Sequence, residues 1–335
     1  MKLLTDAHVR ERLGPARTVD LMRHLLREAW RGRLLAPARA HAGLGTGAVT
    51  VTAGAAGDLY GYRVYDSLPH EGHTADQVVA VHDRATGRLL GLVVGSELGA
   101  RRTGGLGAVA VDLLARPGRC VLGLIGAGQQ AWHQLWAVTA VRPLAEVRVF
   151  SRSGERRAEF ARRAVRELGV EARPVDRARS AVTGADIVIT ATTSPRPVLD
   201  ADWIAPGTHL TTVGPKYADG HELPLALADR ATVIATDSPQ QAAAYRPDFF
   251  LAPTRHFSRL VPLGALLDGA APGRQHPDDV TLYCSVGLAG TEPLLAAALL
   301  ADGPPVPGTR DSGPAATAAA DRPPAAPTAG RPEAP

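Results

Sequence analysis

The feature that most constrains the fold is a glycine-rich turn, GAGQQA at residues 126–131, directly after the apolar run VLGLI at residues 121–125. The run predicts a buried strand, and the residues after the turn predict the start of a helix. In such a unit, Gly126 allows the tight turn and Gly128 lets a pyrophosphate approach the helix N-terminus. Ala131 is small enough for close helix–strand packing. In this context the turn predicts a dinucleotide site, whereas the short pattern alone would also fit a turn without a ligand.

From residue 119 onward, strand-like and helical stretches alternate. Apolar runs occur at residues 120–125, 146–151, 186–192, 208–214, 231–237 and 281–286, and helical patterns lie between some of them. Alternation of this kind predicts βαβ units and a parallel sheet with helices on both faces. We therefore predict an α/β fold with a Rossmann-type dinucleotide-binding domain over residues 118–285.

Residues 1–117 predict a smaller, mixed α+β domain. Thr18 can cap a helix that extends to about Trp30. Strand-like runs follow in close succession at residues 48–53, 60–65, 77–82 and 88–94, which favours an antiparallel sheet. Residues 96–115 then predict a helix, although Gly104, Gly105 and Gly107 weaken that prediction.

The stretch after the second predicted strand of the Rossmann-type domain governs which nicotinamide cofactor fits. An acidic residue there would hold the ribose 2′-hydroxyl of NAD, but the sequence has Ser151, Arg152 and Ser153, followed by Arg156 and Arg157. Hydroxyl and guanidinium groups suit a 2′-phosphate. We favour NADP(H), with NAD(H) as the alternative; the competing interpretation of these residues is a solvated helix start.

Charge, cysteine content and hydropathy argue against several other classes of protein. The formal charge is +4, and no Lys/Arg run with interleaved aromatics indicates a nucleic-acid partner. Cys120 and Cys284 do not suggest a disulfide framework. No apolar segment is long enough for a signal peptide or a membrane helix, so we expect a cytoplasmic protein without a membrane partner. Residues 302–335 are rich in Pro, Ala and Gly, which predicts a disordered tail.

The segment VLGLIGAGQQAWHQLWAVTAVRPLAEVRVFSRS, residues 121–153, resembles the cofactor segment of the ornithine cyclodeaminase/μ-crystallin family. So do LGARRTGG before it and SPRPVLDADWIAPGTHLTTVG, HELP and SVGLAGTE after it, and the resemblance covers about residues 1–300. It implies a homodimer whose N-terminal domain carries dimerisation and substrate contacts, with the chain returning to that domain at about residues 286–301. It also implies a small amino or imino acid as substrate.

The resemblance further implies which side chains bind the substrate and the cofactor. Basic residues match at Arg39 in LAPARAH, Arg63 in YGYRVYD and Arg102 in LGARRTGG, and an Arg fork can hold a carboxylate through two hydrogen bonds. Arg63 replaces the Lys of many members, which argues against proton transfer there because Arg keeps its proton. The implied cofactor contacts are Thr103, Gly126, Gly128, Gln129, Gln130, Ser151, Arg152, Ser153, Thr192, Val213, Gly214 and Gly287.

One loop departs from the family pattern. Cyclodeaminases carry an Asp two residues after the Gly of the VG step, whereas this chain has Lys216 there and Asp219 three residues later. A desolvated Lys near a cation has a lowered pKa and could give a proton to an imine nitrogen. The alternative is that Lys216 points to solvent or to the cofactor phosphates. Asp219 could serve as the acid only if the loop folds differently.

Three weaker candidates lie outside these motifs. HEGH at residues 70–73 is not the HExxH zinc motif, because its second His comes one residue early, so we predict a polar loop and no metal site. Gln77 begins a predicted strand facing that loop and could touch the substrate. Asp237 and Ser238 end a predicted strand at the edge where ligands usually bind, but an ordinary polar strand end is the favoured interpretation.

These features predict an NAD(P)H-dependent imine or ketimine reductase, or an amino-acid dehydrogenase that works in the reverse direction. Three alternatives stay open: a cyclodeaminase that acts as a lyase with bound NAD, an opine-like secondary-amine dehydrogenase of specialised biosynthesis, and a non-catalytic NADPH-binding protein. An absence of any acid or base near the nicotinamide would favour the last.

Overall fold

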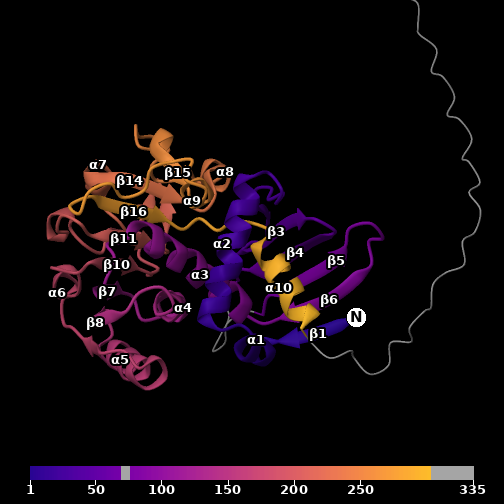
Figure 1. The fold of residues 1–335 in the computed structure, drawn as a ribbon, viewed down its shortest axis with the longest axis horizontal. Helices are drawn as coiled ribbons and strands as arrows, with labels where there is room; N and C mark the ends of the chain where they lie inside the picture. The colour runs from indigo at the N-terminus through magenta and orange to yellow at the C-terminus, as the bar shows by residue number, and fades with distance from the viewer. Residues whose placement is uncertain (69–75, 303–335) are drawn as a thin grey trace, which may run out of the picture. The chain divides into compact units, whose positions relative to one another are not determined.

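The computed structural model describes residues 1–68 and 76–302, which belong to one compact unit containing two large sheets (Figure 1). The predicted loop at residues 70–73 and the predicted tail from residue 303 lie outside the described residues. Within the described part of the chain, no helix combines the length and the apolar character needed to span a bilayer.

The C-terminal half of this unit is built on an eight-stranded sheet in the order β15-β14-β16-β11-β10-β7-β8-β9, with every neighbouring pair parallel. Its strands are β7 (Cys120–Ile125), β8 (Leu144–Phe150), β9 (Ala172–Pro174), β10 (Ile187–Thr190), β11 (His209–Thr212), β14 (Ala231–Thr236), β15 (Leu260–Pro262) and β16 (Val280–Cys284). The connecting helices include α4 (Gln129–Val138), α5 (Gly154–Leu168), α6 (Ala178–Val182), α7 (Ala226–Arg230), α8 (Pro239–Ala243) and α9 (Leu263–Leu267). The α/β class and the parallel sheet are confirmed.

The central strands of this sheet are buried along their whole length. Every residue of β10, β11 and β16 is buried, because helices cover both faces of a parallel sheet. Strand β7 pairs with β8 on one side and with β10 on the other. The strand order therefore reverses at β7, because the chain runs outward through β8 and β9 and then crosses back to β10 on the other side of β7. The carboxyl ends of β7 and β10 form the crevice where such sheets bind ligands.

The first sheet has six strands in the order β1-β6-β5-β4-β3-β2; β1 is parallel to β6 and the other pairs are antiparallel. Its strands are β1 (Lys2–Thr5), β2 (Ala40–Gly43), β3 (Ala48–Ala56), β4 (Leu59–Asp66), β5 (Val78–Asp83) and β6 (Leu89–Val94). Helix α10 (Thr291–Ala301) contacts β3 to β6 (Figure 1). Its close approach requires glycine on the sheet, since a Cβ at Gly61 would lie 2.6 Å from the Cβ of Pro293.

Three more helices complete the first part: α1 (Asp6–Arg12), α2 (Pro15–Trp30) and α3 (Glu97–Leu114). The prediction that Thr18 caps a helix is wrong. Helix α2 begins at Pro15, which suits the first helical position, and the Thr18 hydroxyl donates to the carbonyl oxygen of Gly14 at 2.8 Å. The glycines that weaken α3 in isolation let α4 pack against it, because Cβ atoms at Gly104 and Gly107 would collide with α4.

Helix α10 brings the end of the described chain back to the first sheet, as the predicted return of residues 286–301 requires. The two sheets themselves fall within residues 2–94 and 120–284. The domain boundaries at residues 117 and 285 stay a prediction, because the described residues form one compact unit.

Candidate active site

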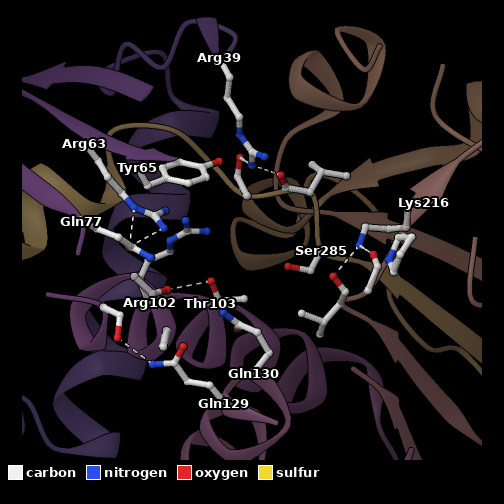
Figure 2. Close-up of a pocket in the computed structure, with 18 of the residues that line it drawn as sticks. Arg39, Arg63, Tyr65, Gln77, Arg102, Thr103, Gln129, Gln130, Lys216 and Ser285 are labelled. Carbon is white, nitrogen blue, oxygen red and sulfur yellow. Dashed lines mark hydrogen bonds between the residues drawn. The ribbon is translucent and has the colours of Figure 1, made fainter. Parts of the chain in front are cut away.

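A cavity of about 390 Å³ lies between β4 and α3 on one side and the loops after β11 and β16 on the other (Figure 2). Segments that are distant in sequence bring many of the predicted site residues to it. Those that line it are Arg39, Arg63, Gln77, Arg102, Thr103, Gln129, Gln130, Val213, Gly214, Lys216 and Gly287. The lining also includes Tyr65, Tyr245 and Ser285, which the sequence did not single out.

The glycine turn after β7 has the geometry that a dinucleotide requires. Gly126 has a φ of +122°, and a Cβ atom there would collide with the carbonyl oxygen of Ala191. Gly128 is the N-cap of α4, and the position of its missing Cβ faces open space. The first N–H groups of an α-helix lack carbonyl partners within the helix, so this space suits a pyrophosphate. The buried Oε1 atom of Gln130 has no hydrogen-bond partner in the described structure, which leaves an acceptor for a ligand.

Glu222, directly after the short strand β13 (Gly220–His221), ties the carboxyl ends of β10 and β11 together. Its fully buried carboxylate accepts hydrogen bonds at 2.7–2.8 Å from the hydroxyl groups of Thr190, Thr192 and Thr212. It also accepts hydrogen bonds at 2.6–3.2 Å from the backbone N–H groups of Thr192, Val213 and Gly214. The predicted cofactor residues of these loops are thus held by one side chain. The HELP pattern contains Glu222 but does not indicate this role, because its partners belong to other segments.

Glu292, near the start of α10, is a buried carboxylate shared by two predicted substrate-binding residues. Its Oε1 accepts a hydrogen bond from Nη1 of Arg63 at 2.6 Å and another from Nη2 of Arg102. Arg63 also donates from Nε and Nη2 to Oε1 of Gln77, at 3.0 and 2.7 Å. Gly99 leaves room for this pair, since a Cβ there would lie 2.9 Å from both side chains. All three guanidinium nitrogens of Arg63 therefore have partners within the protein.

Arg39 and Arg102 keep donors that no described residue accepts. The Nε atoms of both are buried and have no hydrogen-bond partner. Nη2 of Arg39 donates to the carbonyl oxygens of Val286 and Gly287. Gly287 permits this approach through a φ of +86° and the lack of a Cβ. Both guanidinium groups can therefore offer N–H donors to a carboxylate.

Burial and the neighbouring charges shift the pKa values of Glu292 and Arg102 in opposite directions. Burial alone would raise the pKa of Glu292, but the charges of Arg102 and Arg63 lower it to about 2. Burial alone would lower the pKa of Arg102, but the charges of Glu292 and Asp237 raise it. At neutral pH two guanidinium groups face one carboxylate, so the cluster keeps a positive charge that attracts an anionic substrate group.

Lys216 begins the short strand β12 (Lys216–Tyr217), and only 3% of it is exposed. Its Nζ donates to the carbonyl oxygen of Val213 at 2.9 Å and to that of Gly214, so it faces the cavity rather than solvent. Burial lowers the pKa of Lys216, although the charge of Glu222 acts in the opposite direction.

The structure does not bring Asp219 to the cavity. Strands β12 and β13 pair in a tight antiparallel hairpin, and Asp219 is exposed in its turn. The loop therefore folds so that Lys216 and not Asp219 lines the cavity, which corrects the prediction of Asp219 as a catalytic acid.

The predicted 2′-phosphate cluster follows β8 and does not line this cavity. Ser151 donates from its hydroxyl to the carbonyl oxygen of Ser153 at 3.0 Å. Ser153 is the N-cap of α5 and accepts a hydrogen bond from the N–H of Arg156 at 3.2 Å. Ser153 thus stabilises a helix end, while exposed Arg152 is accessible to an anionic ligand at the carboxyl end of β8.

Asp237 and Ser238 have structural roles, which agrees with their interpretation as an ordinary polar strand end. The Asp237 carboxylate accepts hydrogen bonds from the N–H groups of Val286 and Gly287 at 2.8 and 2.7 Å, which shapes the loop after β16. Ser238 caps α8. Across residues 1–68 and 76–302, no group of three or more His, Cys, Asp or Glu side chains is placed to hold a metal ion.

Comparisons with known proteins agree with this geometry. The model of the ornithine cyclodeaminase/mu-crystallin family matches residues 4–302. Ketimine reductase mu-crystallin from Mus musculus is 34% identical over 239 residues, which cover 70% of this chain and 73% of the relative. The structure of Thermococcus litoralis Δ1-pyrroline-2-carboxylate reductase in complex with NADH and L-proline matches with a TM-score of 0.84 at 26% identity, covering 90% of this chain and 97% of that one. A lysine cyclodeaminase structure, concerned with recognition of L-lysine, L-ornithine and L-2,4-diaminobutyric acid, matches with a TM-score of 0.77 at 32% identity, covering 89% and 91%. The match of the family model over nearly the whole described chain shows that this protein belongs to the ornithine cyclodeaminase/mu-crystallin family.

Proposed function

We propose that this protein is a nicotinamide-dependent oxidoreductase that reduces the C=N bond of a small imino acid. The observation that carries the proposal is the meeting, in one cavity, of the helix start after the dinucleotide turn, the free donors of Arg39 and Arg102, and Lys216. Two relatives support the reaction class, one named a ketimine reductase and the other a Δ1-pyrroline-2-carboxylate reductase bound to NADH.

The chain's own groups bind, orient and protonate the substrate. Arg39 and Arg102 hold its carboxylate, and Glu292 keeps Arg102 in place. NAD(P)H, when bound at the glycine turn, supplies the hydride to the imine carbon. Lys216 gives a proton to the imine nitrogen, and burial makes its ammonium a stronger acid. A hydride and a proton together convert C=N into CH–NH.

We further propose NADP(H) as the preferred cofactor. Exposed Arg152 supports it, since no acidic side chain follows β8 to hold a ribose 2′-hydroxyl. The NADH-bound structure of the T. litoralis relative shows that NAD(H) suits at least one related protein. The homodimer and the cytoplasmic location stay predictions.

A cyclodeaminase is the second candidate, because the lysine cyclodeaminase structure is 32% identical to this chain. That protein recognises diamino acids, and the distal ammonium of a diamino acid bound in this cavity would meet Lys216. No Asp or Glu belongs to the described lining of the cavity to receive that charge. The charge distribution therefore favours imine reduction.

The proposal is tested by following NADPH absorbance with cyclic imines and with 2-oxo acid plus amine mixtures. We expect NADPH oxidation that depends on the imine and falls strongly in Arg102→Ala. NADPH binding without turnover of any imine in the panel would overturn the proposal and favour a binding protein.

A further inference from the structure

Lysine is almost absent from this chain, although arginine is abundant. Of the 37 Lys and Arg residues, only Lys2 and Lys216 are lysines. Arginine keeps its proton in proteins, whereas a lysine amine can lose its proton and then act as a nucleophile. Lys2 is half-buried in β1, where its Nζ donates to the carbonyl oxygen of Leu300 at 2.7 Å. Lys216 is the lysine that lines the cavity, so it is placed to use this reactivity.

The hydrogen bonds of Lys216 fit a neutral amine. Its Nζ donates to the carbonyl oxygens of Val213 and Gly214, and no carboxylate within residues 1–68 and 76–302 forms an ion pair with it. A neutral amine has two N–H groups, which make both of these bonds and leave the lone pair free. An ammonium would have a third N–H for which the described part of the chain supplies no acceptor, in a residue that is only 3% exposed.

Burial outweighs the effect of the charged groups that act on Lys216. Burial lowers its pKa, and the charge of Arg39 acts in the same direction. Glu222, Asp237 and Cys284 act to raise the pKa, which still stays below its usual value. Both carboxylates accept hydrogen bonds from hydroxyl or N–H groups elsewhere, and burial raises the pKa of Cys284 to about 12, so its thiol is neutral. A lysine desolvated in this way is suited to attack a carbonyl carbon.

The cavity also contains donors that suit the carboxylate of a 2-oxo acid. Arg39 and Arg102 converge near Gly287, where a Cβ would approach guanidinium nitrogens of both side chains. Their Nε donors have no partner in the described structure and can hold a carboxylate. Figure 2 shows Lys216 on the opposite side of the cavity from Arg102. A 2-oxo acid held by the two guanidinium groups would therefore place its carbonyl carbon in the space that Lys216 also lines.

We propose that Lys216 forms a Schiff base with a 2-oxo acid and passes it to a primary amine, so that the protein assembles the imine that it reduces. The Lys216 amine attacks the carbonyl carbon, and its two protons leave with the carbonyl oxygen as water. The primary amine then attacks the same carbon, the C–N bond to Lys216 breaks, and the two protons of the incoming amine pass to Nζ. Lys216 takes up one further proton and becomes the acid of the reduction. This inference rests on the proposed imine reduction and adds the step that supplies its substrate.

Reductive trapping tests the Schiff base without relying on turnover. The full chain is incubated with pyruvate and sodium cyanoborohydride, which reduces a Schiff base to a stable secondary amine, and the modified peptides are quantified by mass spectrometry. We expect at least about tenfold more adduct on Lys216 than on Lys2 at neutral pH, because a desolvated lysine is the more reactive amine. The yield on Lys216 should increase as pH rises through its pKa, since only the amine form attacks. This dependence is opposite to that expected for reduction of a preformed cyclic imine.

Matched variants show which groups the adduct requires. Lys216→Arg keeps the cation but cannot form a Schiff base, so it should lose NADPH oxidation with pyruvate plus methylamine. Arg102→Ala should lower the yield on Lys216, and Lys2→Arg is the control that should keep it. Equal labelling of both lysines, or no labelling of Lys216 in the folded protein, would overturn the inference. Reduction of a preformed cyclic imine without labelling would leave the proposed function intact, whereas labelling without reduction of any imine would support the Schiff base and remove the proposed reduction.

Discussion

The guanidinium groups of the cavity differ in how many donors they have left for a substrate. Arg63 is committed to Gln77 and Glu292 through all three nitrogens, whereas Arg102 contacts Glu292 through Nη2 and keeps Nε free. Arg63 therefore mainly positions its neighbours, and Arg102 is the better partner for a carboxylate.

Arg102→Ala is expected to lower kcat/KM by about 30-fold or more, because losing a desolvated charged contact costs about 2–5 kcal/mol. NADPH affinity should remain nearly unchanged, since the dinucleotide turn is intact. Steady-state kinetics and a fluorescence titration with NADPH measure both. Arg166→Ala, exposed on α5, is the matched control. Normal turnover in folded Arg102→Ala would show that the side chain does not bind substrate.

The kcat/KM for imine reduction should fall as pH rises through the pKa of Lys216, which burial places below the usual lysine value of about 10.4. Only the ammonium form donates a proton, so activity is full below this pKa and is lost above it. Lys216→Met should abolish the alkaline fall and reduce kcat/KM by about 10²–10⁴-fold. The exposed variant Asp219→Asn should keep the wild-type pH profile. A Lys216→Met enzyme with the same alkaline fall would assign the proton to another group.

The two glycines of the turn between β7 and α4 have different roles: Gly126 is needed for folding and Gly128 for cofactor binding. We expect Gly126→Ala to reduce the free energy of unfolding, because its φ of +122° and the nearby Ala191 carbonyl oxygen exclude a Cβ. Gly128→Ala should fold normally, since its φ is −98° and its Cβ would meet open space. That Cβ would occupy the approach of the pyrophosphate and weaken NADPH binding. Urea unfolding and NADPH titration of both variants measure the two effects. Equal free energies of unfolding and equal NADPH affinities in the two variants would contradict these separate roles.

The turn between β8 and α5 should determine the choice of cofactor. We expect tighter binding of NADPH than of NADH, because Arg152 is exposed at the carboxyl end of β8 and can pair with a 2′-phosphate. Arg152→Ala should weaken NADPH binding and leave NADH binding unchanged. Titration of both cofactors into both proteins decides the matter. Tighter NADH binding that does not respond to Arg152→Ala would show that the turn is only a solvated helix start.

The cavity exists only because segments that are distant in the sequence meet in the folded chain. Strand β4 and helix α3 supply the Arg cluster, the loop after β11 leads to Lys216, and α10 returns to the first sheet with Glu292 (Figure 1). Neither sheet carries the complete site. The reaction that this protein performs thus depends on the combined charge of both halves.

That combined charge leads us to expect no efficient cyclisation of L-ornithine to proline. The distal ammonium of ornithine beside Lys216 would be repelled by around 4 kcal/mol at a separation of about 4 Å and an effective dielectric of about 20. Incubation with L-ornithine and catalytic NAD+, followed by measurement of proline and ammonia, tests this. Proline formation at a rate comparable to imine reduction would refute the charge argument.

The sequence by itself determined the features that short windows encode. GAGQQA after an apolar strand specifies a turn and helix start, because glycine conformation and apolar periodicity are local properties. Alternation of strands and helices specified the parallel sheet. The start of α2 was missed although Pro15 signals it locally, since Thr18 also resembles a cap.

Only the tertiary structure decided which charges meet and which are buried. Glu292 lies 190 residues from Arg102 in sequence and shares its carboxylate with Arg63, and Glu222 reaches Thr190 over 32 residues. The hairpin of β12 and β13 places Lys216 in the cavity and leaves Asp219 outside it. The pKa of a buried group and the number of its free donors depend on every neighbour in space. These neighbours are fixed by how the chain crosses between the two sheets, so no local pattern in the sequence reveals them.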